Sequence, residues 1–267
     1  MKPFQNQVVL ITGANSGIGK AIALQCADQQ ARLVLVARNL ERLQAVQAHC
    51  EARGAEVLSI AMDVQDRNAC ARLIEQSVAR FGQLDVLINN AGVTMWARFD
   101  EIQDPETLPN LMNINFWGSV WCTYYALPHL KTSQGRIVGV SSLTGKAGVP
   151  TRSIYAATKH AMAGFFDSLR VELDGTGVSV TMIYPGFVQS EIRGRAIGAD
   201  GNALGESPVQ EQNVMTADEC ARQILMATAA RKREVVMTLR GKLGQWVKLI
   251  APRLVDRIAR KAIEKGV

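Results

Sequence analysis

The sequence predicts an α/β protein: a doubly wound parallel sheet of about seven strands, helices on both faces and a C-terminal amphipathic helical tail. Short apolar segments rich in β-branched residues, typical of strands buried on both faces, alternate with segments of helical spacing. Two of the helical segments end in Gly54 and Gly82, where a helix C-cap is expected. This alternation implies right-handed crossovers between parallel strands.

The strand-like segments follow one another along the first two thirds of the chain. They are VVLIT (8–12), ARLVLVA (31–37), EVLSIAM (56–62), LDVLIN (84–89), RIVGVS (136–141) and VSVTMIY (178–184). Helical segments lie between them, for example LERLQAVQAHCEARG and NACARLIEQSVARFG. Ligands of such sheets bind beyond the carboxyl ends of the strands, so functional residues are expected there.

One domain is expected to span residues 1–240, with no internal repeat. Residues 190–215 interrupt the alternation because they are glycine-rich, polar and without a long apolar period. They are expected to form a surface excursion that serves as a substrate lid. Residues 241–267 are expected to form a basic amphipathic extension.

Composition excludes several classes of protein. The chain is 48% hydrophobic and 20% charged, which is typical of a globular protein. Its five widely spaced cysteines form no CxxC pair, and its three histidines do not cluster with other ligand residues, so reduced thiols and no metal site are expected. The start MKPFQNQVVLITG lacks a signal-peptide pattern and no long uncharged apolar run follows, so a cytoplasmic location is expected.

The net charge of +6 is confined to the tail. Residues 231–267 hold 11 Lys/Arg and 3 Asp/Glu, whereas residues 1–230 hold 19 and 21. The body therefore lacks a basic footprint, and no nucleic-acid partner is expected.

The tail has two interpretations. Its apolar residues recur with helical spacing, its basic residues lie mostly elsewhere around the axis, and Pro252 should kink or divide the helix. The apolar stripe either rests on anionic lipid as a peripheral membrane contact or docks on its own domain or a partner subunit. Docking on protein is favoured, because every amphipathic helix shows this pattern. The stripe comprises Leu243, Trp246, Val247, Ile250, Leu254, Ile258 and Ala262.

The segment VVLITGANSGIGKAIA predicts a dinucleotide site. It runs from a strand through Gly13, Gly17 and Gly19 into a helix. Glycines allow a tight turn and close approach of the backbone to a pyrophosphate at the helix N-terminus.

The end of the second strand favours NADP(H) over NAD(H). Ala37 and Arg38 stand where an NAD site would place an acidic residue, and a guanidinium suits a 2′-phosphate. Asp63 and Val64 follow the third strand and are placed to meet the adenine, although Asp63 could instead cap the next helix.

SIYAATKHAMAG places Tyr155 and Lys159 four residues apart on one helix face, and Ser142 follows a strand thirteen residues before Tyr155. On spacing alone, such a pair is more often ordinary surface decoration. His160 points about 100° away around the helix and is assigned to packing or an interface.

Together these residues resemble the short-chain dehydrogenase/reductase family, over about residues 5 to 240. The tail loosely resembles that of hydroxysteroid dehydrogenase-like members. The resemblance implies a Rossmann-type fold, NAD(P)-dependent carbonyl/alcohol chemistry and a homodimer or homotetramer, and Arg38 matches the NADP-preferring pattern. The matching segments are Thr12-Gly13-Ala14-Asn15-Ser16-Gly17-Ile18-Gly19, Asn89-Asn90-Ala91-Gly92, Asn115-Phe116-Trp117-Gly118, Ser142, Tyr155 with Lys159, and Pro185-Gly186.

The resemblance also implies roles for individual residues. Asn115, Ser142, Tyr155 and Lys159 match the family's catalytic tetrad. Ser190 stands where the family usually has a threonine that contacts the nicotinamide, so a hydroxyl is retained. The implied cofactor-binding residues are Gly13, Asn15, Ser16, Gly17, Ile18, Gly19, Arg38, Asp63, Val64, Asn90, Ala91, Gly92, Tyr155, Lys159, Pro185, Gly186, Val188 and Ser190.

The chemistry explains why such residues belong together. A tyrosine of pKa about 10 is a poor base until a nearby cation such as Lys159 stabilises its phenolate. The Ser142 hydroxyl could hydrogen-bond the substrate oxygen, and Asn115 could hold a water near Lys159; the alternatives are a helix-capping serine and a buried amide.

Met95, Trp96, Val149 and Phe187 suggest an apolar pocket for a moderately large ketone, aldehyde or alcohol, although core packing explains such residues equally well. The expected function is an NADP(H)-dependent carbonyl reductase that also works as an alcohol dehydrogenase. The alternatives are an NAD-dependent alcohol dehydrogenase and a non-catalytic NADP(H)-sensing regulatory protein.

Overall fold

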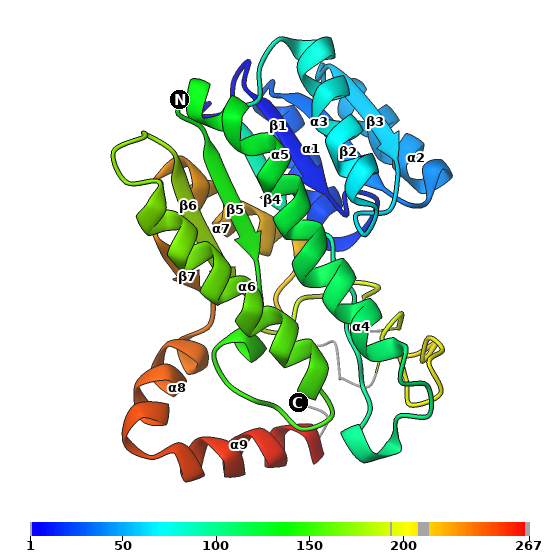
Figure 1. The fold of residues 1–267 in the computed structure, drawn as a ribbon, viewed down its shortest axis with the longest axis vertical. Coiled ribbons are helices and arrows are strands. Elements are labelled where there is room, and N and C mark those ends of the chain that lie inside the picture. The colour runs from blue at the N-terminus through cyan, green and yellow to red at the C-terminus, as the bar shows by residue number, and fades with distance from the viewer. Residues whose placement is uncertain (1, 193, 208–213, 265–267) are drawn as a thin grey trace.

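Seven parallel strands form one sheet in the order β3-β2-β1-β4-β5-β6-β7 (Figure 1). The computed structural model describes residues 2–192, 194–207 and 214–264. The doubly wound parallel sheet predicted from the sequence is confirmed. The three-residue strand β7 is not among the strand segments identified from apolar runs. The strands are β1 (Val8–Thr12), β2 (Arg32–Ala37), β3 (Val57–Ala61), β4 (Val86–Asn89), β5 (Arg136–Val140), β6 (Ser179–Tyr184) and β7 (Glu234–Val236).

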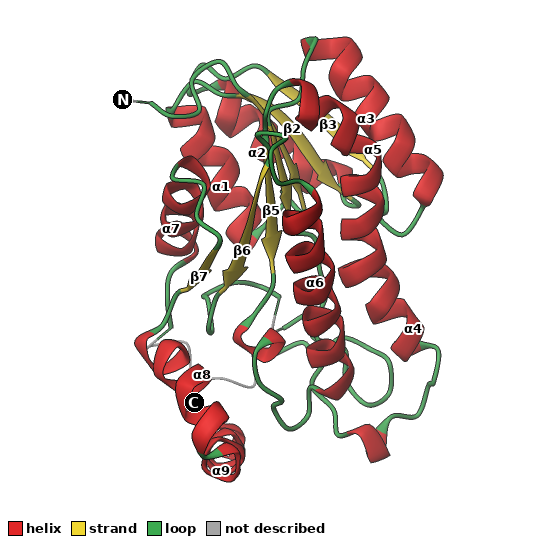
Figure 2. Ribbon diagram, turned by 60° about the vertical axis from the view of Figure 1, so that its left-hand side comes forward, coloured by secondary structure: helices red, strands yellow, loops and turns green. Residues whose placement is uncertain are grey.

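Helices cover both faces of the sheet (Figure 2). Helices α1 (Gly17–Asp28), α2 (Leu40–Glu51) and α7 (Ala217–Ala229) enclose one hydrophobic core against it. Helices α3 (Arg67–Phe81), α5 (Gly118–Thr132) and α6 (Ser153–Glu172) enclose the other. Strand alternation divides β1 between the two cores, since Val9 and Ile11 belong to the first, and Val8 and Leu10 to the second.

The order of the strands creates the place for a ligand. The chain builds β1, β2 and β3 in one direction and then returns to place β4 on the other side of β1. The connections that leave β1 and β4 therefore diverge to opposite faces and leave a crevice at the carboxyl ends of these strands.

Local sequence signals set the ends of α3. Oδ1 of Asp66 accepts hydrogen bonds from the backbone N–H groups of Asn68 and Ala69, at 2.8 and 3.0 Å. Gly82 ends the helix with φ of 77°, the left-handed conformation that favours glycine. Asp66, rather than Asp63, is therefore the helix cap, and the capping alternative for Asp63 is wrong.

Short irregular elements lie beyond the carboxyl edge of the sheet. They are two 3₁₀ turns, η1 (Phe99–Glu101) and η3 (Leu143–Gly145), the helix α4 (Thr107–Met112) and a π-helical turn, η2 (Asn113–Trp117). The described residues of the segment 190–215 contain no helix or strand. Backbone hydrogen bonds join this segment to the loop after β4, from Trp96 N to Ile197 O and from Ile197 N to Thr94 O, both at 2.9 Å.

The tail forms two helices, α8 (Leu239–Ile250) and α9 (Pro252–Glu264), and Pro252 divides them as predicted. Ala262 belongs to α9, but its side chain lies outside the described part of the structure. Within that part, no helix combines the length and the apolar character that a membrane span requires. All five cysteines are buried and none of them forms a disulfide bond. Burial raises the pKa of Cys50 to about 11 and that of Cys220 to about 12.

Candidate active site

A groove of about 530 Å³ lies at the carboxyl ends of β1, β2, β3 and β4, a volume suited to a cofactor. Most of the residues implied as cofactor contacts line it. These are Gly13, Asn15, Ser16, Gly17, Ile18, Arg38, Asp63, Val64, Asn90, Ala91, Gly92 and Ser190.

The glycine loop leaves room for a pyrophosphate at the start of α1. Gly13 and Gly17 have φ of +68° and +51°, and a Cβ on Gly13 would lie 2.9 Å from Ala91 Cα. No side-chain hydrogen bond caps α1 and its first turn carries no acidic residue, so the positive end of the helix is available to an anion. The loop therefore fits a dinucleotide pyrophosphate.

Two of the predicted contact residues support the loop. Gly19 does not line the groove; a Cβ on it would lie 2.2 Å from Gly13 O, so glycine is needed for the helix to pack under the loop. Asn90 Nδ2 donates to Thr12 O at 2.9 Å, while Thr12 Oγ1 accepts from the N–H groups of Asn90 and Ala91 at 3.0 Å each. Asn90 thus ties the β1 and β4 loops together.

Three arginines line the groove near the end of β2, and the sequence prediction named only Arg38 among them. Arg38 lies 3.7 Å from Asp63 Oδ2. Glu191 pairs with Arg42, at 2.7 Å, and with Arg195. Arg42 follows Arg38 by four residues, a signal that could have found it, whereas Arg195 comes from the 190–215 segment. The excess of cations suits a phosphate group.

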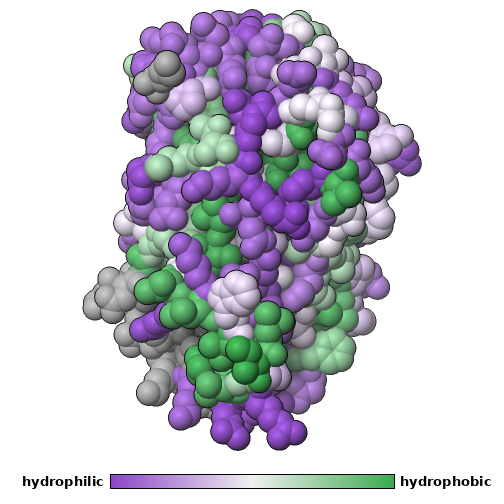
Figure 3. All heavy atoms as spheres, turned by 90° about the vertical axis from the view of Figure 1, so that its left-hand side faces the viewer, coloured by the Kyte–Doolittle hydropathy of each residue, from purple (hydrophilic) through white to green (hydrophobic). Residues whose placement is uncertain are grey.

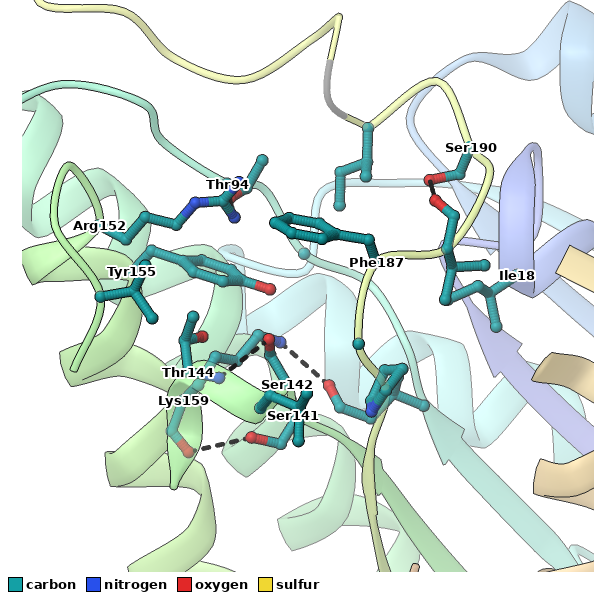
Figure 4. A pocket seen from close by; sticks show the side chains of 18 of the residues that line it. Ile18, Thr94, Ser141, Ser142, Thr144, Arg152, Tyr155, Lys159, Phe187 and Ser190 are labelled. Atoms are coloured by element: carbon teal, nitrogen blue, oxygen red, sulfur yellow. Dashed lines mark hydrogen bonds between the residues drawn. The ribbon is translucent and has the colours of Figure 1, made fainter. Parts of the chain in front are cut away.

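A second cavity of about 250 Å³ adjoins the groove (Figure 4). It brings together Ser142, Tyr155 and Lys159 with two expected pocket residues, Val149 and Phe187. Pro185, Gly186 and Val188, which were predicted to contact the cofactor, line it as well. The two cavities share Ile18, Asn90, Gly92, Val93, Ser190 and Ile192.

Tyr155 and Lys159 are both buried, one turn apart on α6. Lys159 Nζ lies 5.7 Å from the centroid of the Tyr155 ring and donates a hydrogen bond to Val140 O at 3.0 Å. Burial lowers the pKa of Lys159 to about 8, because the charged ammonium loses its hydration. The pair is therefore not surface decoration.

The two serines after β5 serve different partners. Ser141 Oγ donates to Lys159 O at 3.2 Å. Ser142 Oγ accepts from Thr144 N at 3.2 Å and so caps η3, and in Figure 4 it lies below the Tyr155 hydroxyl, which points into the cavity. Burial raises the pKa of Tyr155, whereas the Arg152 charge and a hydrogen bond with Ser142 lower it. The Ser142 hydroxyl can therefore cap η3 and contact Tyr155 at the same time.

Asn115 is fully buried in η2 and lines neither cavity. Its Oδ1 accepts from Val93 N at 2.8 Å, and its Nδ2 donates to Val93 O at 2.9 Å and to Thr158 Oγ1 at 3.0 Å. A Cβ on Gly92 would lie 3.0 Å from Asn115 Oδ1 and 3.6 Å from Lys159 Nζ. Asn115 therefore sits beside the lysine, with its amide engaged in holding the β4 loop.

Two expected pocket residues lie outside the cavity lining. Met95 is fully buried in a cluster with Leu111 and Tyr155, and so packs behind the tyrosine. The Trp96 ring lies 4.2 Å from the guanidinium carbon of Arg152. Both residues shape the pocket through a neighbour that lines it.

Arg152 is a buried cation of the cavity wall that the sequence prediction missed. Its guanidinium carbon lies 5.7 Å from the ring centroids of both Tyr155 and Phe187, and its Nη1 donates to Thr94 Oγ1 at 3.1 Å. Its position three residues before Tyr155 was a usable signal, because Arg152 is the N-cap of α6 and Tyr155 lies in the first turn of that helix.

The cavity also has a wall from the tail. Ala259 and Ile263 of α9 line it, about a hundred residues after Tyr155. His160, by contrast, is exposed, with Nδ1 at 2.9 Å from Ala156 O. No group of three or more potential metal ligands occurs among residues 2–192, 194–207 and 214–264.

This chain is similar to proteins of a known family. A family model described as short chain dehydrogenase matches residues 7–199. An 11-beta-hydroxysteroid dehydrogenase from Pinus massoniana is 37% identical over 259 residues, which are 94% of this chain and 72% of the relative. A dehydrogenase/reductase SDR family protein 7-like from Dictyostelium discoideum is 31% identical, over 99% of this chain and 84% of that protein.

A solved structure shares the fold. It is an alcohol dehydrogenase from the archaeon Thermococcus sibiricus, complexed with 5-hydroxy-NADP. The TM-score is 0.75 at 24% identity, covering 86% of this chain and 94% of the other.

Proposed function

Because this chain belongs to the short-chain dehydrogenase family, and is therefore an oxidoreductase, we propose that it interconverts a ketone or aldehyde and an alcohol with NADP(H) as the hydride carrier. One observation carries the proposal: Ser142, Tyr155 and Lys159 line a cavity that shares six residues with the dinucleotide groove. A homodimeric or homotetrameric state and a cytoplasmic location are part of the same proposal.

NADP(H), held by the glycine loop and Arg38, would supply hydride to a carbonyl carbon or accept it from an alcohol carbon. In reduction, negative charge develops on the substrate oxygen, which needs a proton. The Tyr155 hydroxyl points into the cavity and donates that proton, and the Ser142 hydroxyl beside it donates a hydrogen bond to the same oxygen. In oxidation, Tyr155 accepts the proton from the alcohol.

Two cations stabilise the phenolate that proton donation leaves. The nitrogen of Lys159 and the guanidinium carbon of Arg152 each lie 5.7 Å from the centroid of the Tyr155 ring. The Arg152 charge opposes the burial that raises the pKa of Tyr155. In this proposal the nearby ammonium of Lys159 adds to the stabilisation of the phenolate. Asn115 acts as a positioning residue, because its amide fixes the β4 loop against which Lys159 packs.

An apolar, moderately large substrate suits this cavity. Most of its wall is hydrophobic, with Val149 and Phe187 from the body and Ala259 and Ile263 from the tail. The names of the relatives, several of them hydroxysteroid dehydrogenases, support the same class of substrate. The described residues of the 190–215 segment, joined to the β4 loop through Ile197, cover the site as a lid in this proposal.

A turnover screen tests the proposal, with nicotinamide fluorescence as the readout. NADPH and NADH are each offered with aliphatic, aromatic, steroid-like and retinoid-like carbonyls. Reduction of apolar carbonyls with NADPH is expected. Tight NADPH binding without turnover on any of them would favour the non-catalytic NADP(H)-sensing alternative.

Arg38→Gln is expected to raise the KM for NADPH roughly tenfold or more and to leave that for NADH nearly unchanged. The reason is that a charge-assisted hydrogen bond to the 2′-phosphate contributes about 1.5–3 kcal/mol. Steady-state kinetics with both cofactors measure the effect, and Arg72→Gln on α3, away from the groove, is the control. An unchanged KM for NADPH would remove Arg38 from the cofactor site.

Arg152→Met is expected to displace the pH dependence of alcohol oxidation toward higher pH. Oxidation needs the deprotonated tyrosine, and the Arg152 charge lowers the pKa of Tyr155, so its removal raises that pKa. The profile of kcat/KM against pH measures the shift. Arg152→Lys, which keeps a cation, should restore most of the original profile. If Arg152→Met has the same pH profile as the wild type, Arg152 has only a packing role.

A further inference from the structure

Helices α8 and α9 carry a surface of large apolar side chains that remain exposed in the described part of the chain. Figure 3 shows hydrophobic residues gathered at the lower end of the molecule, with hydrophilic residues beneath them. We call this surface the tail face. It comprises Leu239, Leu243, Trp246, Leu249, Ile250, Leu254 and Ile258, between 48% and 86% exposed.

The tail face does not serve the folding of its own domain. The apolar stripe was expected to dock on its own domain or on a partner subunit. Trp246 and Ile250 of that stripe are 70% and 86% exposed, so they do not dock on their own domain. Burying such side chains is favourable, and soluble monomers rarely leave a contiguous group of them in water. An external apolar surface is therefore the missing partner.

Cations surround the tail face. Residues 239–264 hold seven Lys/Arg and two Asp/Glu. All seven basic residues are exposed: Arg240, Lys242, Lys248, Arg253, Arg257, Arg260 and Lys261. A partner that is apolar inside and negatively charged outside matches both features at once.

We propose that the tail face docks on an anionic lipid surface. Two copies of this chain meeting through the same face would bring two positively charged tails together, which is electrostatically unfavourable. Anionic headgroups instead attract the cations, while the acyl chains accept the leucines and isoleucines. Trp246, exposed among them, is a residue type that settles at the boundary of headgroups and acyl chains.

Helix α9 links the tail face to the catalytic cavity. Leu254 and Ile258 belong to the tail face, whereas Ala259 and Ile263 line the cavity from the same helix. Docking therefore separates the cavity from the lipid by one helix, and an apolar substrate dissolved in the membrane is held close to its site. This supply of substrate rests on the proposed function; the docking itself does not.

Co-sedimentation of the full chain with sucrose-loaded vesicles tests the docking. The chain is expected to bind vesicles of phosphatidylcholine with phosphatidylserine on the order of tenfold better than vesicles of phosphatidylcholine alone. Raising the salt from about 0.1 to about 1 M should erase that preference, because the screening length falls to about 3 Å.

Variants on the tail face sharpen the test. Leu249→Glu combined with Ile250→Glu should abolish vesicle binding and keep the fold, since both side chains are exposed. Val171→Glu is the control, because Val171 is an apolar residue on α6 that is 70% exposed, and this variant should bind vesicles like the wild type. Arg253→Gln with Arg257→Gln should remove the preference for phosphatidylserine only.

Each remaining outcome decides the proposal. Wild type that sediments no better than the Leu249→Glu/Ile250→Glu variant overturns it. A wild-type dimer that this variant converts to a monomer, without vesicle binding, also overturns it and assigns the face to a second copy. Turnover of a water-soluble carbonyl without vesicles is measured in parallel, so failure of the proposed function is seen separately from failure of docking.

Discussion

Tyr155→Phe is expected to lower turnover with any carbonyl substrate about a thousandfold, the usual contribution of a positioned general acid. Only the hydroxyl that points into the cavity is lost, and the ring still packs against Met95 and Leu111. The affinity for NADPH should therefore stay close to that of the wild type. Single-turnover fluorescence measures the chemical step, and fluorescence titration measures NADPH binding.

Tyr184→Phe is the matched control for this variant. Tyr184 is also buried, ends β6, and its hydroxyl has no hydrogen-bond partner among the described residues. Removal of the Tyr184 hydroxyl should leave turnover unchanged. Undiminished turnover in Tyr155→Phe, or an equal loss in Tyr184→Phe, would contradict the mechanism.

Lys159→Met is expected to abolish turnover while it stabilises the folded chain by roughly 2 kcal/mol at pH 7. Burial lowers the pKa of Lys159 from 10.5 to about 8, which corresponds to a cost of about 3 kcal/mol for keeping the ammonium charged in the fold. The lost hydrogen bond to Val140 O offsets about 1 kcal/mol of the gain. Urea unfolding measures the free energy, and the exposed Lys131→Met serves as the control.

The pH dependence of this gain has a definite sign. Between pH 8 and 10.5 the unfolded chain still binds the proton that folded Lys159 has released, so the free energy of unfolding of the wild type rises across that window. The difference between Lys159→Met and wild type should therefore be largest below pH 8 and vanish near pH 10.5. A difference that is constant with pH would show that the ammonium is not the source of the cost.

The fold was predictable because its signals are local. Strands buried on both faces produce short apolar runs, and one-sided helices produce a 3.6-residue period. Strand β7 was not predicted, because its three residues EVV are too few to show either pattern. Its pairing with β6, through Tyr184 and Val236, comes from the neighbouring strand and from no preference of its own.

The chemical core of the candidate site was also within reach of the sequence. The glycine loop, Ser142, Tyr155 and Lys159 were recognised by spacing and by resemblance to the short-chain dehydrogenase/reductase family, and that family membership is confirmed. The structure brings these residues to the groove and the adjoining cavity. Their roles in catalysis and in cofactor binding stay predictions for the variants described above.

The sequence by itself determined the fold class and the family and predicted the reacting side chains, because each depends on residues close together in the chain or on strand ends that parallel topology must align. Only the tertiary structure decided the surroundings of those side chains: Arg152 beside Tyr155, Arg195 in the groove, and Ile263 of α9 in the cavity wall. Such neighbours are set by how helices and loops pack across the sheet edge. Ile263 is more than a hundred residues from Tyr155, yet both line the same cavity. Periodicity and spacing along the sequence do not predict contacts between residues about a hundred positions apart.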